Sequence, residues 1–262
     1  MRVGIVGYGN MGGAFAKSLA NSVGKENITI YEISEQKRKE AIEDGFAVAK
    51  DLYFLAQSSD VVLLAVKPKD VRSVLLELKE SLKGKILLSV AAGLELSFYE
   101  EVLGKDQKIV RLMPNINLLV GKGTIAVVHN GKLEEEEFDG VLKILSCCGS
   151  LYEIPESLFD SFTALAGSGP AFVFQFIDAL ALAGVKEGFS YEEALRIASD
   201  TLAGSAELIR TLGGNPNDWT TKVTSPGGTT IEGLAYLERK GFKGMVMRCV
   251  EKTSEKAKRL KG

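Results

Sequence analysis

The chain begins with an apolar run that leads directly into a glycine-rich loop, and this pairing restricts the fold more than any other feature. Residues 2–7 have the composition of a short β-strand, and residues 7–12 read Gly-Tyr-Gly-Asn-Met-Gly, a GxGxxG spacing. A helical pattern and a second β-like run at 27–31 follow. In this context the spacing predicts a dinucleotide site, with a glycine-rich turn that binds no ligand as the alternative. The glycines would permit the tight turn, the approach of a pyrophosphate and close helix–strand packing at Gly7, Gly9 and Gly12, respectively.

Further apolar runs alternate with helical patterns as far as Pro155. Runs of β-strand character lie at 60–66, 85–90, 108–112, 125–128 and 151–154. Strands separated by helices predict an α/β fold with a Rossmann-type, doubly wound parallel sheet over residues 1–155. Such sheets bind ligands outside the carboxyl ends of their strands. We therefore expect one crevice to be lined by the loops 7–11, 66–70, 91–93 and 113–115.

The residues after the second β-like run bear on which dinucleotide would bind. Glu32 stands near the end of this run, where an acid can bind the adenosine ribose hydroxyls and repel a 2′-phosphate. Ser34, Lys37 and Arg38 follow and could instead receive a phosphate, unless the two cations simply face solvent. Glu32 favours NADH over NADPH, with NADPH tolerated.

The pattern changes after Pro155, because residues 156–262 carry helical patterns and no clear strand. The sequence Gly-Ser-Gly-Pro at 167–170 should kink or break one helix, and apolar positions up to Leu260 mark the last one. The segment 171–185 is apolar nearly all round and must be covered on every side. A partner subunit is the natural cover, and complete burial within one chain is the alternative. We therefore expect an all-α, dimerising C-terminal domain.

One loop in this helical half has the chemistry of a small-anion site. It reads Val-Thr-Ser-Pro-Gly-Gly-Thr-Thr from Val223 to Thr230, and a helical pattern follows. A glycine turn that leads into a helix presents free backbone N–H groups and the positive end of the helix dipole, which suit a carboxylate or phosphate. The hydroxyls of Ser225, Thr229 and Thr230 add donors and acceptors. The alternative is an ordinary helix start that one of the threonines caps.

Composition argues against several other classes of function. The 262 residues carry a net charge of −2, so there is no basic signal for nucleic acid or an anionic membrane. Gln175 and Asp178 interrupt the segment 171–185, which is too short and too polar to span a bilayer. With His129 as the single histidine and no Cys-x-x-Cys among three cysteines, we expect no metal site. Buried free thiols and the absence of a signal-peptide pattern predict a cytoplasmic protein.

Five motifs, in their order and spacing, resemble pyrroline-5-carboxylate reductases over essentially the whole chain. They are GYGNMG at 7–12, AVKP at 65–68, RLMPN at 111–115, ALAGSGPAF at 164–172 and VTSPGGTTI at 223–231. The resemblance implies hydride transfer from NAD(P)H to the C=N bond of Δ1-pyrroline-5-carboxylate, giving L-proline in the last step of proline biosynthesis. It also implies helical domains interlocked between two subunits, in dimers that often assemble further into decamers.

The residues and the resemblance together identify candidate site residues. The resemblance implies that the Thr230 hydroxyl meets the ring nitrogen, and Ser225 is the second candidate catalytic residue. The candidate substrate contacts are Val223, Ser225, Gly227, Gly228, Thr229 and Thr230. The candidate cofactor contacts are Gly7, Gly9, Asn10, Met11, Gly12, Glu32, Ser34, Ala65, Val66, Lys67, Pro68, Ala92, Gly93, Met113, Pro114 and Asn115. For Lys67, a lysine at a strand end that faces solvent is the alternative.

The sequence departs from the family pattern in two places. Ile116-Asn117 follows Met-Pro-Asn where Thr-Pro is usual, and residues 213–222 differ ahead of the substrate loop. A reductase of another cyclic imine therefore stays open, as does a non-catalytic dinucleotide-binding protein. A β-hydroxyacid dehydrogenase-like enzyme would need a lysine on the first helix of the second domain, and residues 158–185 contain none.

Overall fold

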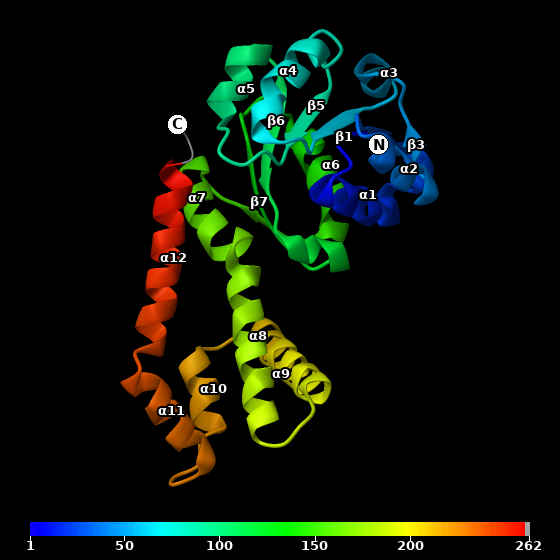
Figure 1. The fold of residues 1–262 in the computed structure, drawn as a ribbon. Helices are drawn as coiled ribbons and strands as arrows, with labels where there is room; N and C mark the ends of the chain where they lie inside the picture. The colour runs from blue at the N-terminus through cyan, green and yellow to red at the C-terminus, as the bar shows by residue number, and fades with distance from the viewer. Residues whose placement is uncertain (260–262) are drawn as a thin grey trace. The chain divides into compact units, whose positions relative to one another are not determined.

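The computed structural model describes residues 1–259 and divides into two compact units. The first comprises residues 1–168 together with the described residues from 254 onward, and the second comprises residues 169–253. Figure 1 shows the sheet with its flanking helices in the first unit and the helices of the second. Leu260, the last position predicted for the final helix, lies outside the described residues.

The first unit contains an eight-stranded sheet in the order β3-β2-β1-β4-β5-β6-β7-β8. Its strands are β1 (Val3–Val6), β2 (Ile28–Tyr31), β3 (Ala47–Val48), β4 (Val61–Leu64), β5 (Ile86–Ser89), β6 (Lys108–Met113), β7 (Gly123–His129) and β8 (Gly149–Glu153). Its helices are α1 (Asn10–Val23), α2 (Glu35–Glu43), α3 (Leu52–Gln57), α4 (Pro68–Leu78), α5 (Leu96–Leu103), α6 (Glu135–Leu145) and α7 (Phe159–Phe162). The predicted Rossmann-type α/β fold is confirmed.

Side chains of the central strands alternate between two hydrophobic clusters, because successive residues of a strand point to opposite faces of the sheet. Val61 and Leu63 of β4 lie in the cluster that holds residues of α1 and α6. Val62 and Leu64 lie in the cluster that holds residues of α3, α4 and α5. All four are fully buried. Helices cover both faces, which explains why these runs are apolar at every position.

The sheet differs from the prediction at one pair of strands and by one additional strand. β6 pairs with β7 in the antiparallel sense, whereas the other pairs are parallel. Only residues 114–122 connect these two strands, and a parallel pairing needs a crossover of about a dozen residues or more. The expectation of a wholly parallel sheet is therefore wrong at this pair. The sequence patterns also do not predict β3, which is only two residues long.

The described residues of the second unit form helices and no strand, as predicted. α8 (Gly169–Lys186) packs against α9 (Tyr191–Leu212), and α10 (Pro216–Lys222), α11 (Thr229–Arg239) and α12 (Phe242–Arg259) follow, the last of which continues into the first unit. The rings of Phe176 on α8 and Phe242 on α12 lie 5.9 Å apart. The last strand ends at Glu153, while the compact units divide between Ser168 and Gly169. The domain boundary after residue 155 stays a prediction.

α8 is apolar and largely exposed within the single chain, where only Pro170 and Ala181 of this helix are buried. A π-helical turn at Thr163–Gly167 and a bend at Ser168 form an irregularity where the Gly-Ser-Gly-Pro sequence was expected to kink or break the helix. The resulting stretch Glu156–Lys186 has 31 residues and is long and apolar enough to cross a membrane. The expectation that this segment is too short to span is therefore wrong. Interface helices of soluble proteins share this composition, so the absence of a membrane span stays a prediction.

The cysteines are all free, as expected, but they are not all buried. Cys148 is buried, Cys147 is partly buried, and Cys249 of α12 is exposed in the single chain. The expectation of three buried thiols is wrong for Cys249, because the second unit has few side chains that cover this helix. In residues 1–259, no group of three acidic, histidine or cysteine side chains is placed to hold a metal ion.

Candidate active site

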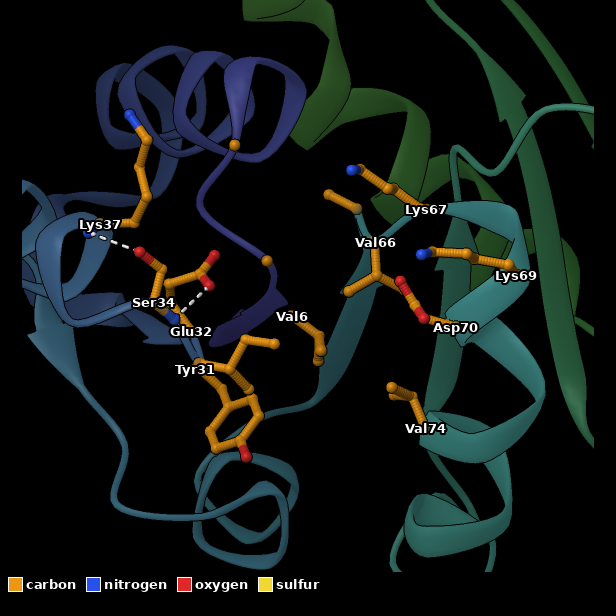
Figure 2. A pocket seen from close by; sticks show the side chains of 14 residues that line it. Val6, Tyr31, Glu32, Ser34, Lys37, Val66, Lys67, Lys69, Asp70 and Val74 are labelled. Atoms are coloured by element: carbon orange, nitrogen blue, oxygen red, sulfur yellow. Dashed lines mark hydrogen bonds between the residues drawn. The ribbon is translucent and has the colours of Figure 1, made fainter.

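A cleft of about 540 Å³ opens at the carboxyl ends of β1, β2 and β4. β1 lies between the other two strands, so the cleft forms where the order of the strands reverses, the usual place for a ligand in this fold. In Figure 2, Glu32 and Ser34 lie on one wall, and Val66, Asp70 and Val74 lie on the other. Of the predicted cofactor contacts, those that line the cleft are Gly7, Gly9, Glu32, Ser34, Ala65, Val66 and Lys67.

The glycines of the first loop differ in whether the fold would leave room for a side chain at their positions. Gly7 has φ +100°, and a Cβ there would come within 2.8 Å of the Ala65 carbonyl oxygen. A Cβ on Gly12 would lie 1.9 Å from the carbonyl oxygen of Gly7. By contrast, a Cβ on Gly9 would meet no heavy atom within 4 Å. Gly7 and Gly12 are therefore required by the fold itself, while Gly9 faces open space on the side of the cleft.

The loop leads into the N-terminus of α1. Gly9 is the N-cap residue, and no side chain among the described residues caps this helix. Asn10 and Met11 form the first helical positions. The first N–H groups of an α-helix have no partner within the helix, and together with the dipole they attract a phosphate. This uncapped start beside an open glycine is a cradle that a dinucleotide pyrophosphate fits.

Glu32 connects the glycine loop with the turn after β2. One carboxylate oxygen accepts a hydrogen bond from the backbone N–H of Tyr8 at 2.7 Å, and the other accepts from the N–H of Ser34 at 2.8 Å. The Ser34 hydroxyl in turn accepts from the N–H of Lys37 and caps α2. The Lys37 ammonium is paired with Glu40. Glu32 thus places a negative charge in the cleft, while the Lys37 ammonium is already engaged by Glu40.

The opposite wall comes from the start of α4. Pro68 occupies its first turn and Lys67 its N-cap position. Lys67 and Lys69 are exposed and lie on the same wall in Figure 2. Two ammonium groups at this edge would attract the phosphates of a dinucleotide. The solvent-facing alternative for Lys67 agrees with its exposure, so its contact with a cofactor stays a prediction.

The remaining predicted cofactor contacts lie outside the lining of the cleft. Ala92 and Gly93 follow β5, and Met113, Pro114 and Asn115 stand at the end of β6, a strand parallel to β5. The side chain of Asn115 is 4% exposed. Its amide donates to the Ala166 carbonyl at 3.0 Å and accepts from the N–H of Thr124 at 3.1 Å. Asn115 therefore ties the chain together, and its contact with a cofactor stays a prediction.

A buried polar network lies at the same edge of the sheet and was not predicted. Arg111 is 3% exposed and donates to Glu156 at 2.8 Å. The same Glu156 oxygen accepts from the N–H of Leu96. The hydroxyls of Ser89 and Tyr99 lie 2.6 Å apart, and burial raises the pKa of Tyr99 to about 12. These contacts join β5, β6 and α5 to the segment after β8, which makes the network a structural support.

The predicted substrate residues form one turn in the second unit. The N–H of Gly228 donates to the Ser225 carbonyl at 3.1 Å, and Gly227 has φ +68°. α11 starts at Thr229 with Gly228 as its N-cap, and no described side chain caps it. Neither Thr229 nor Thr230 serves as the cap, so the interpretation as a threonine-capped helix start is wrong. A Cβ on Gly228 would lie 2.3 Å from the Ser225 Oγ, so this hydroxyl sits directly beside the uncapped helix start.

The region that departs from the family pattern organises the helix before this turn. The Trp219 indole N–H donates to the Gly213 carbonyl at 2.8 Å. The ammonium of Lys222 lies 3.9 Å from the centroid of the Trp219 ring, a cation–π contact. These contacts are confined to residues 213–222, and the turn that follows keeps its glycines and hydroxyls.

Several lining residues of the cleft were missed by sequence reasoning. They are Val6, Tyr31, Ile33 and Val74, whereas Lys69 and Asp70 belong to the loop 66–70 that was predicted to line the crevice. The signal for the first three was present, because they adjoin predicted contacts at the ends of β1 and β2. Val74, one turn into α4, depends on how this helix is rotated against the sheet, and no local pattern reveals that.

Comparison with known proteins places the chain in one family. Residues 156–260 match the family model described as pyrroline-5-carboxylate reductase dimerisation, and residues 2–93 match that of NADP oxidoreductase, coenzyme F420-dependent. The pyrroline-5-carboxylate reductase of Aquifex aeolicus is 60% identical over 260 residues, which cover 99% of this chain and 97% of the relative. That of Escherichia coli K12 is 37% identical over 264 residues, covering 99% and 98%.

A solved structure agrees with the sequence relatives. The pyrroline carboxylate reductase of Plasmodium falciparum, solved with NADP bound, has a TM-score of 0.89 and 34% identity, and the match covers 100% of this chain and 98% of the other. Likeness of this extent, in sequence and in fold and along the whole chain, shows that the chain belongs to the pyrroline-5-carboxylate reductase family.

Proposed function

We propose that the chain catalyses the NAD(P)H-dependent reduction of Δ1-pyrroline-5-carboxylate to L-proline, the last step of proline biosynthesis. The observation that carries this proposal is the end-to-end likeness to a reductase that is 60% identical. The chain keeps both elements that the reaction requires. The first unit holds a dinucleotide cradle, and the second holds an anion site with hydroxyls.

The substrate is a small ring with one carboxylate and one imine, and it requires few contacts from the protein. The carboxylate fits the backbone N–H groups at the start of α11, beside the Ser225 hydroxyl. A protonated imine is already electrophilic, so a single hydroxyl at the ring nitrogen is sufficient, and Thr230 takes this role. When bound, NAD(P)H supplies the hydride. The contribution of the protein is to hold and orient the reactants and to exclude water.

NADH is the preferred cofactor in this proposal, with NADPH tolerated. A 2′-phosphate would meet the negative charge of Glu32, whose oxygens are held in place by the N–H groups of Tyr8 and Ser34. The ion pair of Lys37 with Glu40 reduces the charge available to receive that phosphate. The relative from Plasmodium falciparum was solved with NADP, so use of both cofactors within the family is part of the proposal.

The active form is a homo-oligomer built on a dimer, and a decamer is one assembly open to it. The match of residues 156–260 to the dimerisation model supports this. So does the exposed apolar surface of α8, where Phe174 and Leu182 are 54% and 55% exposed in the single chain. A second copy would cover this surface, so no membrane is required. We place the enzyme in the cytoplasm, acting on a small molecule and not on nucleic acid.

The proposal is tested by product analysis with a panel of cyclic imines. The purified chain is incubated with NADH and one imine at a time. The imines are Δ1-pyrroline-5-carboxylate, pyrroline-2-carboxylate and the six-membered analogue. Formation of L-proline mainly from Δ1-pyrroline-5-carboxylate is expected. Faster turnover of another imine would reassign the substrate, and the departures at 116–117 and 213–222 would then be the first places to examine.

A further inference from the structure

Tyr8, the second residue of the glycine loop, has its side chain directed into the protein and not toward the cleft. It is 3% exposed and lies in the hydrophobic cluster between the sheet and α1. Its ring meets that of Phe46 edge-on, with the centroids 6.0 Å apart. A Cβ on Gly13 would lie 3.7 Å from this ring, an ordinary contact distance, so the ring packs close to the first turn of α1.

The hydroxyl of Tyr8 ends in a small polar chain. It donates to Asp44 Oδ2 at 2.7 Å, and the ammonium of Lys17 lies 2.9 Å from the same oxygen. Lys25 donates to the Asp44 carbonyl at 2.8 Å. Asp44 stands at the end of α2, while Lys17 belongs to α1. One tyrosine side chain thus joins the glycine loop to α1 and to the turn after α2.

The backbone of the same residue is held from the other side, because the N–H of Tyr8 donates to Glu32 at 2.7 Å. The peptide that leads into Gly9 follows directly from this residue, which is held at both points, and the surroundings of Gly9 are open to the cleft. We infer that Tyr8 is a positioning residue for the dinucleotide: its hydroxyl, through Asp44, holds the loop so that the Gly9 backbone meets the pyrophosphate without rearrangement. This inference rests on the dinucleotide site of the proposed function.

The protonation states support a permanent contact. Burial and the neighbouring Asp44 raise the pKa of Tyr8 above its ordinary value, so the phenol stays a donor at neutral pH. Hydrogen bonds from Lys17 and Tyr8 lower the pKa of Asp44, which keeps it an ionised acceptor. A loop that is already fixed in the free protein loses little conformational freedom on binding, which improves affinity.

The test is a direct titration of the full chain with NADH, followed by the fluorescence of the nucleotide and without substrate. Tyr8→Phe keeps the ring and removes only the hydroxyl. We expect its Kd for NADH to rise roughly three- to tenfold, the size of one net hydrogen bond, while kcat at saturating NADH stays unchanged. Asp44→Ala should raise the Kd similarly. The double variant should bind no more weakly than the weaker single variant, because both changes remove the same contact.

Gln107→Met is the matched control for loss of stability alone. Gln107 is also buried and donates to the Lys85 carbonyl at 2.7 Å, but it stands at the amino end of β6, away from the cleft. Thermal unfolding should show losses of similar size for Gln107→Met and Tyr8→Phe, with only the latter changing the Kd. An unchanged Kd in Tyr8→Phe, or an equal rise in Gln107→Met, would overturn the positioning role. If the unaltered protein binds neither NADH nor NADPH, the proposed function itself fails.

Discussion

Two alanine substitutions in the glycine loop should separate the needs of the fold from those of the ligand. At Gly12 a Cβ would lie 1.9 Å from the Gly7 carbonyl oxygen, a backbone atom that cannot rotate away. Overpacking of this kind costs about 3 kcal/mol at the upper end, and the better helix propensity of alanine offsets about 1 kcal/mol. We therefore expect Gly12→Ala to lower the free energy of unfolding by about 2 kcal/mol, which lowers Tm by about 4–8 °C for a domain of this size.

Gly9→Ala should have the opposite profile. Its φ of −75° is open to alanine, and nothing lies within 4 Å of the added Cβ. The loss of glycine at the N-cap and the smaller entropy of the unfolded chain roughly cancel, so Tm should stay within about 2 °C of the unaltered protein. The new methyl group would, however, occupy the side from which a pyrophosphate approaches. The Kd for NADH should rise at least about tenfold, since a charge-assisted hydrogen bond contributes about 1.5–3 kcal/mol.

Thermal unfolding by circular dichroism and titration with NADH measure both quantities on the same samples. Unfolding of Gly12→Ala at the temperature of the unaltered protein, or an equal loss of stability in Gly9→Ala and Gly12→Ala, would refute the different roles of the two glycines. Unchanged binding by Gly9→Ala would mean that the pyrophosphate does not lie over this loop.

Three further predictions concern other residues. Thr230→Ala should raise the activation free energy calculated from kcat/KM by about 1–3 kcal/mol, because it removes one buried hydrogen bond to the substrate. Steady-state kinetics measure this change. Glu32→Gln should raise the ratio of kcat/KM for NADPH over NADH about tenfold, because it removes one charge near the 2′-phosphate. The pKa of Tyr99, raised to about 12 by burial, lies above its unfolded value, so its contribution to stability is complete below pH 10 and is lost as the pH rises toward 12. Urea unfolding at pH 9 and pH 11 should show a loss for the unaltered protein that exceeds that of Tyr99→Phe by about 1 kcal/mol.

Each of these has a control within the chain. Thr230→Ser keeps the hydroxyl and should retain most of the activity. Equal kinetics for Thr230→Ala and the unaltered protein would remove Thr230 from the mechanism. Glu40→Gln releases Lys37 from its ion pair and leaves Glu32 in place. A larger shift toward NADPH in that variant than in Glu32→Gln would mean that Lys37 decides the preference. Identical pH dependence for Tyr99→Phe and the unaltered protein would contradict the raised pKa.

Much of the first unit could be predicted, because its signals are local. Runs that are apolar at every position, such as Val61–Leu64, indicate strands covered on both faces, and the glycine spacing locates the carboxyl edge where the cleft forms. The antiparallel pairing of β6 with β7 was also foreseeable from the short connection at 114–122, but it requires attention to loop length and not to strand pattern.

The rest of the site depends on contacts that are distant in sequence. Tyr8 and Asp44 are 36 residues apart, and Arg111 and Glu156 are 45 apart. Neither pair has a local pattern, since only the packed sheet brings its members together. The far wall of the cleft at Val74 depends likewise on the rotation of α4. The anion turn at 225–230 is the reverse case, because glycines, hydroxyls and helix start are all contiguous in the sequence.

The most direct test of the account is steady-state oxidation of NADH and of NADPH, measured in parallel with Δ1-pyrroline-5-carboxylate as the substrate. We expect turnover with both cofactors, L-proline as the product and a higher kcat/KM for NADH. A higher kcat/KM for NADPH would contradict the role given to Glu32. The absence of turnover with either cofactor, in a protein that still binds NADH, would contradict the proposed reaction itself.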